Sequence, residues 1–160
     1  MKTLTIHLNV NGRDYLLESD ASRTLLEVLR EDLGLTGVKQ ACEGTGECGA
    51  CMVIMNGKAT NSCLVFIGQA DCAQIQTIEG VAPAGSLHPL QRAFLELGSV
   101  QCGFCTPGII MAAKALLESN PDPSDNEIKD ALSGNLCRCT GYNRIVDAVQ
   151  DSARRQAGKA

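Results

Sequence analysis

The chain has 160 residues, with 14 Lys and Arg against 18 Asp and Glu, so its net charge is -4 at pH 7. This length and the 44% share of hydrophobic residues are typical of a globular protein with one or two domains. Three Phe, two Tyr and no Trp leave few aromatic platforms for stacking bases, and the acidic balance disfavours phosphate-rich surfaces. We therefore expect neither nucleic acid nor a membrane to be a partner.

The cysteine content is unusual for a chain of this size. We find no signal-peptide pattern at the N-terminus and no 18-residue apolar run, so we expect a cytoplasmic protein. In a reducing compartment, nine cysteines are not expected to form a disulfide framework. The cysteines are therefore candidates for metal binding or catalysis.

The first predicted elements are two strands and a helix. Residues 3–10 alternate polar and apolar side chains, which predicts a half-buried strand, and Asn11-Gly12 predicts a tight turn into a return strand over 13–18. A capping box at residues 24–27 opens a helix that Gly34 can end.

A cysteine- and glycine-rich loop follows over residues 42–51. The next predicted hairpin begins at residues 52–55 and turns at Asn56-Gly57, and residues 74–78 form a last strand. These elements predict a small mixed sheet with one helix. The small residues 80–86 then indicate a linker.

The rest of the chain has the pattern of four short helices. Pro89 and Pro107 open the first two, residues 120–123 interrupt the pattern, a second capping box at 124–127 opens the third, and the fourth begins near Asn143. In the first of these helices we expect the core to contain Leu90, Ala93, Phe94 and Leu97. The simplest packing is four antiparallel helices.

Eight of the nine cysteines fall into two groups of four, one in each predicted unit. The first cysteine group, Cys42, Cys48, Cys51 and Cys63, follows C-x5-C-x2-C-x11-C, and the second, Cys102, Cys105, Cys137 and Cys139, follows C-x2-C-x31-C-x-C. Four thiolates suit either a tetrahedral zinc ion or an iron-sulfur cluster.

The loop around the first cysteine group favours an iron-sulfur cluster over zinc. Gly44, Gly46 and Gly49 allow the backbone to bend over a bulky centre and to direct N–H groups at its negative charge, which is about -2 for an oxidised 2Fe-2S cluster. The spacing is that of plant-type ferredoxins with one extra residue between Cys42 and Cys48. The second group taken alone indicates only a metal site with four thiolates.

Three longer motifs resemble the small iron-sulfur subunit of the molybdenum hydroxylases, the xanthine oxidase family. They are Cys48-Gly49-Ala50-Cys51, the run from Gln101 to Gly108, and the run from Gly134 to Tyr142. The resemblance spans about residues 3–150, and its one departure is the extra residue after Cys42.

The resemblance implies an α+β chain with two domains. Residues 1–79 would form a plant-type ferredoxin-like β-grasp domain, and residues 80–160 an all-α four-helix-bundle domain, each with one 2Fe-2S cluster. The eight cysteines of the two groups would be the metal ligands. The chain would pass electrons from a molybdopterin centre through both clusters to a flavin or another acceptor, with the cluster of the helical domain nearest to molybdenum.

The resemblance also implies partners. A large molybdopterin-binding subunit, a medium FAD-binding subunit and a dimer of such heterotrimers are expected. Gln101 and Cys139 would contact the pterin on the partner chain. No catalytic residue is expected on this chain, which alone would perform no substrate chemistry within the molybdenum-dependent hydroxylase or dehydrogenase. The alternatives are a free two-cluster ferredoxin-type electron shuttle and a zinc-stabilised interaction module.

Other residues with reactive side chains have simpler expected roles. Cys72 lies outside both groups and is expected to be a small buried residue. His7 and His88 are expected on the surface, because no second acid-base group lies at a useful spacing. Glu43 and Glu47 are expected to face solvent or a partner.

Overall fold

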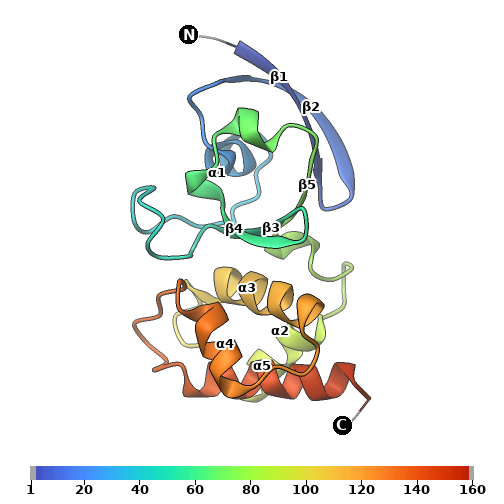
Figure 1. Cartoon of the computed structure of the whole chain (residues 1–160), viewed down its shortest axis with the longest axis vertical. Helices are drawn as coiled ribbons and strands as arrows, with labels where there is room; N and C mark the ends of the chain where they lie inside the picture. Colours follow the sequence, from blue (N-terminus) through green and yellow to red (C-terminus); the bar gives the residue numbers. More distant parts are fainter. Residues whose placement is uncertain (1–2, 159–160) are drawn as a thin grey trace.

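The computed structural model describes residues 3–158, which contain a mixed five-stranded sheet and a set of helices. Figure 1 shows the sheet half above and the helical half below. The strands are β1 (Thr3–Val10), β2 (Arg13–Asp20), β3 (Met52–Met55), β4 (Lys58–Asn61) and β5 (Ala73–Gln76). Their order in the sheet is β2-β1-β5-β3-β4, with β1 and β5 parallel and the other neighbours antiparallel. The predicted mixed sheet is confirmed.

The first hairpin follows directly from the sequence pattern. Ile6, Leu8 and Val10 of β1 are buried on one face of the sheet, as the alternation predicts. Asn11 and Gly12 both have positive φ, which matches the twist of a two-residue hairpin turn. β5 begins one residue earlier than predicted and ends two residues earlier. After it, the backbone turns into a 3-10 helix at Ile78–Gly80.

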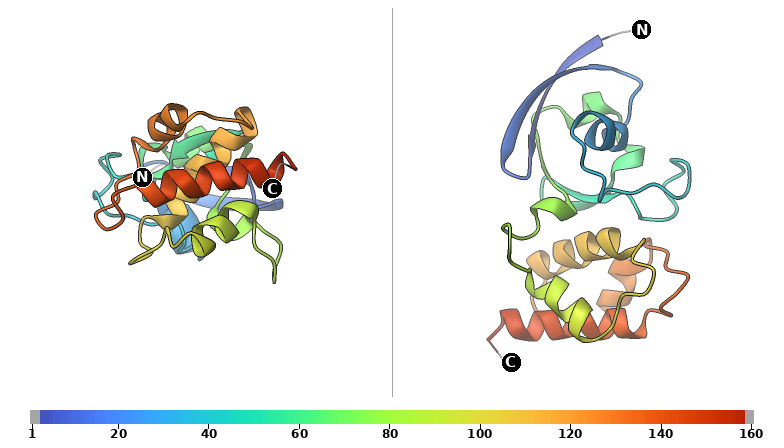
Figure 2. Two further views of the ribbon diagram at one scale, coloured as in Figure 1. Left: turned by 90° about the horizontal axis from the view of Figure 1, so that it is seen from below. Right: turned by 180° about the vertical axis from the view of Figure 1, so that it is seen from behind.

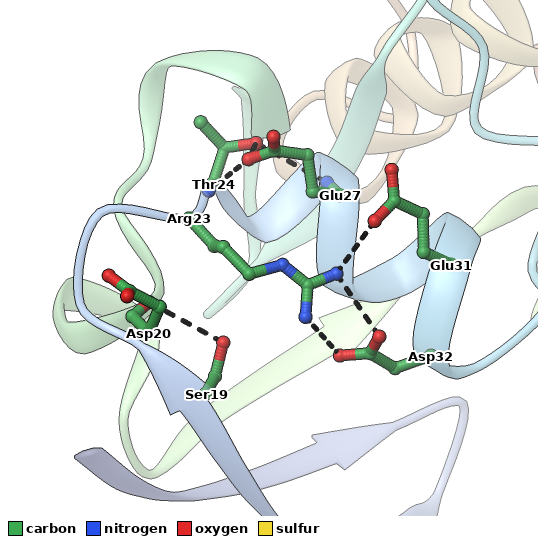
Figure 3. A network of polar contacts seen from close by, with 7 residues as sticks. All are labelled: Ser19, Asp20, Arg23, Thr24, Glu27, Glu31 and Asp32. Carbon is green, nitrogen blue, oxygen red and sulfur yellow. Dashed lines mark hydrogen bonds and ion pairs between the residues drawn. The ribbon is translucent and has the colours of Figure 1, made fainter. Parts of the chain in front are cut away.

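An ion-pair and capping network fixes the segment after β2, as Figure 3 shows. The Thr24 backbone N–H donates to the carboxylate of Glu27 at 2.6 Å, and the Glu27 N–H donates to Thr24 Oγ1 at 3.3 Å. The Arg23 guanidinium contacts Asp32 at 2.7 Å and Glu31 at 2.9 Å. The predicted capping box is thus confirmed. The ion pairs of Arg23 with Glu31 and Asp32 hold the C-terminal end of the same helical segment.

This helix differs from the single helix that the pattern predicts. α1 (Leu25–Glu27) continues as a π-helix over Val28–Asp32, in which the Leu33 N–H bonds to the Val28 carbonyl at 3.1 Å. Gly34 then takes a φ of +68° and ends the segment as expected.

The helical half contains the four predicted helices. They are α2 (Pro89–Glu96), α3 (Thr106–Ser119), α4 (Asp125–Leu132) and α5 (Asn143–Gln156). α2 and α4 each pack against both α3 and α5. Phe94, Ile109, Ile128 and Ile145 are almost completely buried between them. Leu97, predicted to face the core, is 39% exposed. α2 ends at Glu96, so Leu97 lies just beyond the helix and does not continue its buried face.

α3 joins the two halves. In Figures 1 and 2 it lies between the β3–β4 hairpin and the other helices, in agreement with its packing against β3, β4, α2 and α4. Its residues from 108 to 113 are all buried, so it belongs to the interface with the sheet as well as to the helical core. Within residues 3–158, no helix combines the length and the apolar character that crossing a membrane requires.

Candidate metal centres

The first cysteine group converges in the loop before β3 and at the 3-10 helix after β4. The Sγ atoms of Cys42 and Cys48 are 3.3 Å apart, and Cys51 lies close enough to Cys63 to raise its pKa. Two thiolates that share one tetrahedral metal at about 2.3 Å lie roughly 3.7 Å apart. The two pairs therefore fit a binuclear cluster with one cysteine pair on each iron.

The glycine-rich loop over this group needs glycine for its positive φ angles, and a side chain at Gly46 would also displace the Leu64 side chain. Gly46 has a φ of +81°, and a Cβ there would lie 2.5 Å from the Leu64 side chain. The Gly46 carbonyl accepts a hydrogen bond from the Asn61 side-chain amide at 2.9 Å. The loop is thus held against the residue that precedes the Cys63 turn.

The second cysteine group lies between the loop before α3 and the loop between α4 and α5. Cys102 and Cys139 have Sγ atoms 3.6 Å apart, and Cys137 lies close enough to Cys105 to raise its pKa. Cys102 and Cys139 are exposed, whereas Cys105 and Cys137 are half-buried. One cysteine pair of this site therefore faces outward. Within residues 3–158, no three His, Cys, Asp or Glu side chains converge on the position of a single ion.

Hydrogen bonds favour the thiolate form of Cys42 in the first group and of Cys137 in the second. The Thr45 side chain is the largest cause that lowers the pKa of Cys42, which falls to about 6. Burial raises the pKa of Cys137, but hydrogen bonds, led by those from the side chain and backbone of Thr140, together outweigh burial and bring this pKa to about 7.

Burial has the opposite effect on another cysteine of each group. It raises the pKa of Cys63 and of Cys105 to about 12. These two thiols hold their protons at neutral pH in the metal-free chain, so metal binding must displace the protons. The two sites therefore suit a positively charged metal core, which would bind Cys63 and Cys105 as thiolates in place of their protons.

Tyr142 fixes the loop that carries Cys137 and Cys139. Its hydroxyl accepts a hydrogen bond from the Cys137 N–H at 2.7 Å and donates to the Asn135 carbonyl at 2.8 Å. The backbone of Tyr142 is left-handed, with a φ of +67°. Sequence reasoning placed Tyr142 in a motif but missed its contacts, because they depend on the path of the loop.

The two cysteine groups contact each other through backbone. The Leu136 N–H donates to the Cys48 carbonyl at 2.9 Å, and the buried Asn135 side-chain amide donates to the Gly49 carbonyl at 3.0 Å. A Cβ at Gly49 would lie 2.4 Å from the Gly134 carbonyl, so only glycine allows this approach. One hydrogen bond therefore connects a cysteine of the first group to the residue before Cys137. The sequence did not predict this connection.

The residues predicted to contact a pterin are both exposed. Gln101 is exposed and directly precedes Cys102, whose Sγ is 3.6 Å from that of Cys139. Glu43 and Glu47 are also exposed, as predicted. The outward side of the second cysteine group is thus available to a partner.

The predictions for Cys72 and His88 are wrong. Cys72 is exposed rather than buried, and it lies in a turn with a φ of +60° where its N–H bonds to the His7 carbonyl. His88 is half-buried and caps α2, with Nδ1 accepting from the Leu90 N–H at 3.2 Å. Burial and the charge of Lys114 lower the pKa of His88. His7 is exposed, as predicted.

Comparisons with known proteins agree with two iron-sulfur domains. The sequence matches a 2Fe-2S iron-sulfur cluster binding domain over residues 8–74 and a 2Fe-2S binding domain over residues 77–150. It is 54% identical to the nicotinate dehydrogenase small FeS subunit of Eubacterium barkeri, over 98% of this chain and 99% of that one.

Two further relatives extend the comparison. The xanthine dehydrogenase iron-sulfur-binding subunit of Escherichia coli O157:H7 is 46% identical over 94% of each chain. The solved aldehyde oxidoreductase of Desulfovibrio gigas is 48% identical with a TM-score of 0.94, and the match covers 98% of this chain but 18% of that longer one. The chain belongs to the small iron-sulfur subunits of the molybdenum hydroxylases, the xanthine oxidase family, and serves electron transfer in an oxidoreductase through two 2Fe-2S domains.

Proposed function

We propose that this chain relays electrons in a molybdenum-dependent hydroxylase or dehydrogenase through two clusters whose ligands are the two cysteine groups. The ligands are Cys42, Cys48, Cys51 and Cys63 for one cluster and Cys102, Cys105, Cys137 and Cys139 for the other. The observation that carries the proposal is the gathering of eight cysteines into two sets of paired thiols, joined by the Leu136–Cys48 hydrogen bond.

The protein environment suits one-electron transfer without bond making. In each group four thiolates would hold a 2Fe-2S cluster, which supplies one-electron redox chemistry when bound. Cys48, Cys51 and Cys63 are buried, so their group is shielded from water on that side. The direct backbone contact between Leu136 and Cys48 offers a short covalent and hydrogen-bonded route between the groups.

The exposed edges of the two groups support an order along the relay. Gln101, Cys102 and Cys139 would face the molybdopterin of a large subunit, with Gln101 and Cys139 contacting the pterin. The Glu43–Glu47 loop over the first group would face a medium FAD-binding subunit or another acceptor. The assembly would be a dimer of heterotrimers in the cytoplasm, with substrate bound on another chain.

We assign residues 1–79 to a β-grasp domain of the plant ferredoxin type and residues 80–160 to a four-helix bundle. The mixed sheet, whose buried residues share one hydrophobic core with Leu25 and Leu26 of α1, supports the first assignment, and the mutual packing of α2 to α5 supports the second. Each domain would then hold one cluster at the face where the domains meet, which matches the contact between Gly49 and Asn135.

The second candidate function is a free two-cluster ferredoxin that shuttles electrons among partners. The exposed pair Cys102 and Cys139 favours it, because a shuttle must present a cluster to passing proteins. Purification of the natural complex separates the candidates. A subunit stays with a molybdenum-containing chain through ion exchange and gel filtration, whereas a shuttle separates from it.

The pterin contact can be tested by Gln101→Leu in the assembled enzyme. Leu has similar bulk but cannot form hydrogen bonds, and the loss of one such bond typically costs about 1 to 3 kcal/mol. We expect both clusters and the assembly to persist while substrate reduces the second-group cluster more slowly, or while pterin is held less tightly. Rapid mixing with substrate, followed at the cluster absorbance, measures the rate.

The matched control is Gln74→Leu, which alters an exposed glutamine on β5. We expect the control to reduce its clusters at the wild-type rate. Reduction at the wild-type rate and unchanged pterin content in the Gln101 variant would remove Gln101 from the route and leave the cysteine assignment standing.

A further inference from the structure

The hydroxyl of Thr140 lies beside a cysteine of the second group. Its Oγ1 is 3.1 Å from Cys137 Sγ, within hydrogen-bond distance for an oxygen and a sulfur. Cys137 and Cys105 are the half-buried cysteines of the site, whereas Cys102 and Cys139 are exposed. The contact is therefore made where the site is better shielded from water, and hydrogen bonds are stronger there.

The surroundings decide which atom donates. In a metal-free chain either Oγ1 or Sγ could carry the shared proton. As an iron ligand, however, Cys137 is a thiolate without a proton, so only the Thr140 hydroxyl can donate. The Tyr142 backbone N–H points at the same Oγ1 at 3.4 Å and uses one of its acceptor positions. That bond does not use the Thr140 hydroxyl hydrogen, which can therefore be donated to the Cys137 Sγ.

The loop is built to hold this geometry. The Tyr142 hydroxyl occupies the Cys137 N–H at 2.7 Å, and it is anchored in turn on the Asn135 carbonyl. The same short loop therefore fixes both Cys137 and the threonine that faces its sulfur. A side chain held by its neighbours loses little conformational freedom when it forms its hydrogen bond.

Electrostatics gives the direction of the effect. A 2Fe-2S cluster with four thiolates is negative, and it gains one more negative charge on reduction. A hydrogen bond to a ligand sulfur stabilises the more negative state more strongly, and so raises the reduction potential. We propose that the Thr140 hydroxyl donates to Cys137 Sγ and raises the reduction potential of the second-group cluster, which makes that cluster a better electron acceptor.

This inference rests on the proposed function, because it takes Cys137 as an iron ligand. The test is a redox titration of the holoprotein followed by EPR, in which each cluster has its own signal. Thr140→Val keeps the shape of the side chain and removes the hydroxyl, and Thr140→Ser keeps the hydroxyl. Thr106→Val is the matched control, because Thr106 follows the second-group ligand Cys105 but has no hydrogen bond to sulfur among the described contacts.

We expect Thr140→Val to lower the midpoint potential of one EPR signal and to leave the other at its wild-type value. Thr140→Ser and Thr106→Val should both titrate like the wild type. Thr140→Ala is a second removal variant with less bulk, and it should shift the same signal in the same direction. Substitution at a purely structural position would instead change the Ser and Val variants alike.

An unchanged potential in the Val and Ala variants, or an equal shift in the Ser variant, would overturn the inference. Loss of the cluster in both removal variants, with the cluster intact in Thr140→Ser, would also overturn it, since the hydroxyl would then be needed to build the site. A wild-type protein without two iron-sulfur signals would contradict the proposed function itself, so the two failures are distinguishable.

Discussion

At the scale of single residues, the identity of the fourth ligand in the first cysteine group can be tested directly. Cys63 is buried and paired with Cys51, whereas Cys72 is exposed in a left-handed turn. We predict that Cys63→Ser selectively disturbs the first-group cluster and that Cys72→Ser leaves both clusters intact. Iron analysis with EPR of the reduced protein measures this. Iron loss in the Cys72 variant with an intact Cys63 variant would show that Cys72 is the ligand.

Short separations mark the cysteines of one loop as candidate ligands of one site, but the 31 residues between Cys105 and Cys137 give no local signal that their two loops meet. The surroundings of these thiols were less predictable. The roles of Thr140 and Tyr142 depend on a left-handed residue in the loop, and sequence patterns say little about which non-glycine residue adopts that conformation. Cys72 was assigned wrongly because the sequence does not show that this residue lies in an exposed turn.

At the scale of elements, helix starts were more predictable than helix ends and turns. Capping boxes and prolines mark the starts of α1, α2 and α4 with local chemistry that needs no tertiary contact. The π-helix after α1 and the end of α2 at Glu96 carry no comparable local signal in the sequence.

Two loops from different elements meet at Asn135, and this contact can be tested for its effect on stability. Asn135 is 1% exposed, and its side-chain amide donates to the buried Gly49 carbonyl. We predict that Asn135→Ala destabilises the protein, because the Gly49 carbonyl then keeps only the hydrogen bond from the Met52 N–H and loses the one from the buried amide. The net loss of one such hydrogen bond typically costs about 0.5 to 1.5 kcal/mol. For a chain of this size, that corresponds to a fall of roughly 1 to 6 °C in the unfolding midpoint.

Thermal unfolding of the holoprotein, followed by circular dichroism, measures the change. Asn126→Ala is the matched control, because Asn126 is exposed on α4 and should leave the midpoint unchanged. An Asn135 variant as stable as the control would mean that the contact between the loops contributes nothing. Because the wild-type Asn135 Oδ1 has no hydrogen-bond partner, the substitution removes only the hydrogen bond that the side-chain amide donates.

At the scale of the whole molecule, several contacts fix the halves relative to each other. α3 packs on β3 and β4, the Lys39 ammonium lies 5.2 Å from the centre of the Phe104 ring, and Leu136 bonds to Cys48. These contacts join segments far apart in the sequence, so no local pattern could predict them. They hold the two cysteine groups at one separation, which a fixed relay requires.

The central claim is that two binuclear clusters occupy the two cysteine groups. The most direct test is an iron and acid-labile sulfide assay of the full chain, combined with EPR of the dithionite-reduced protein. We predict about four irons and four sulfides per chain and two distinct EPR signals. Stoichiometric zinc, or a single EPR signal with half of that iron, would contradict the claim.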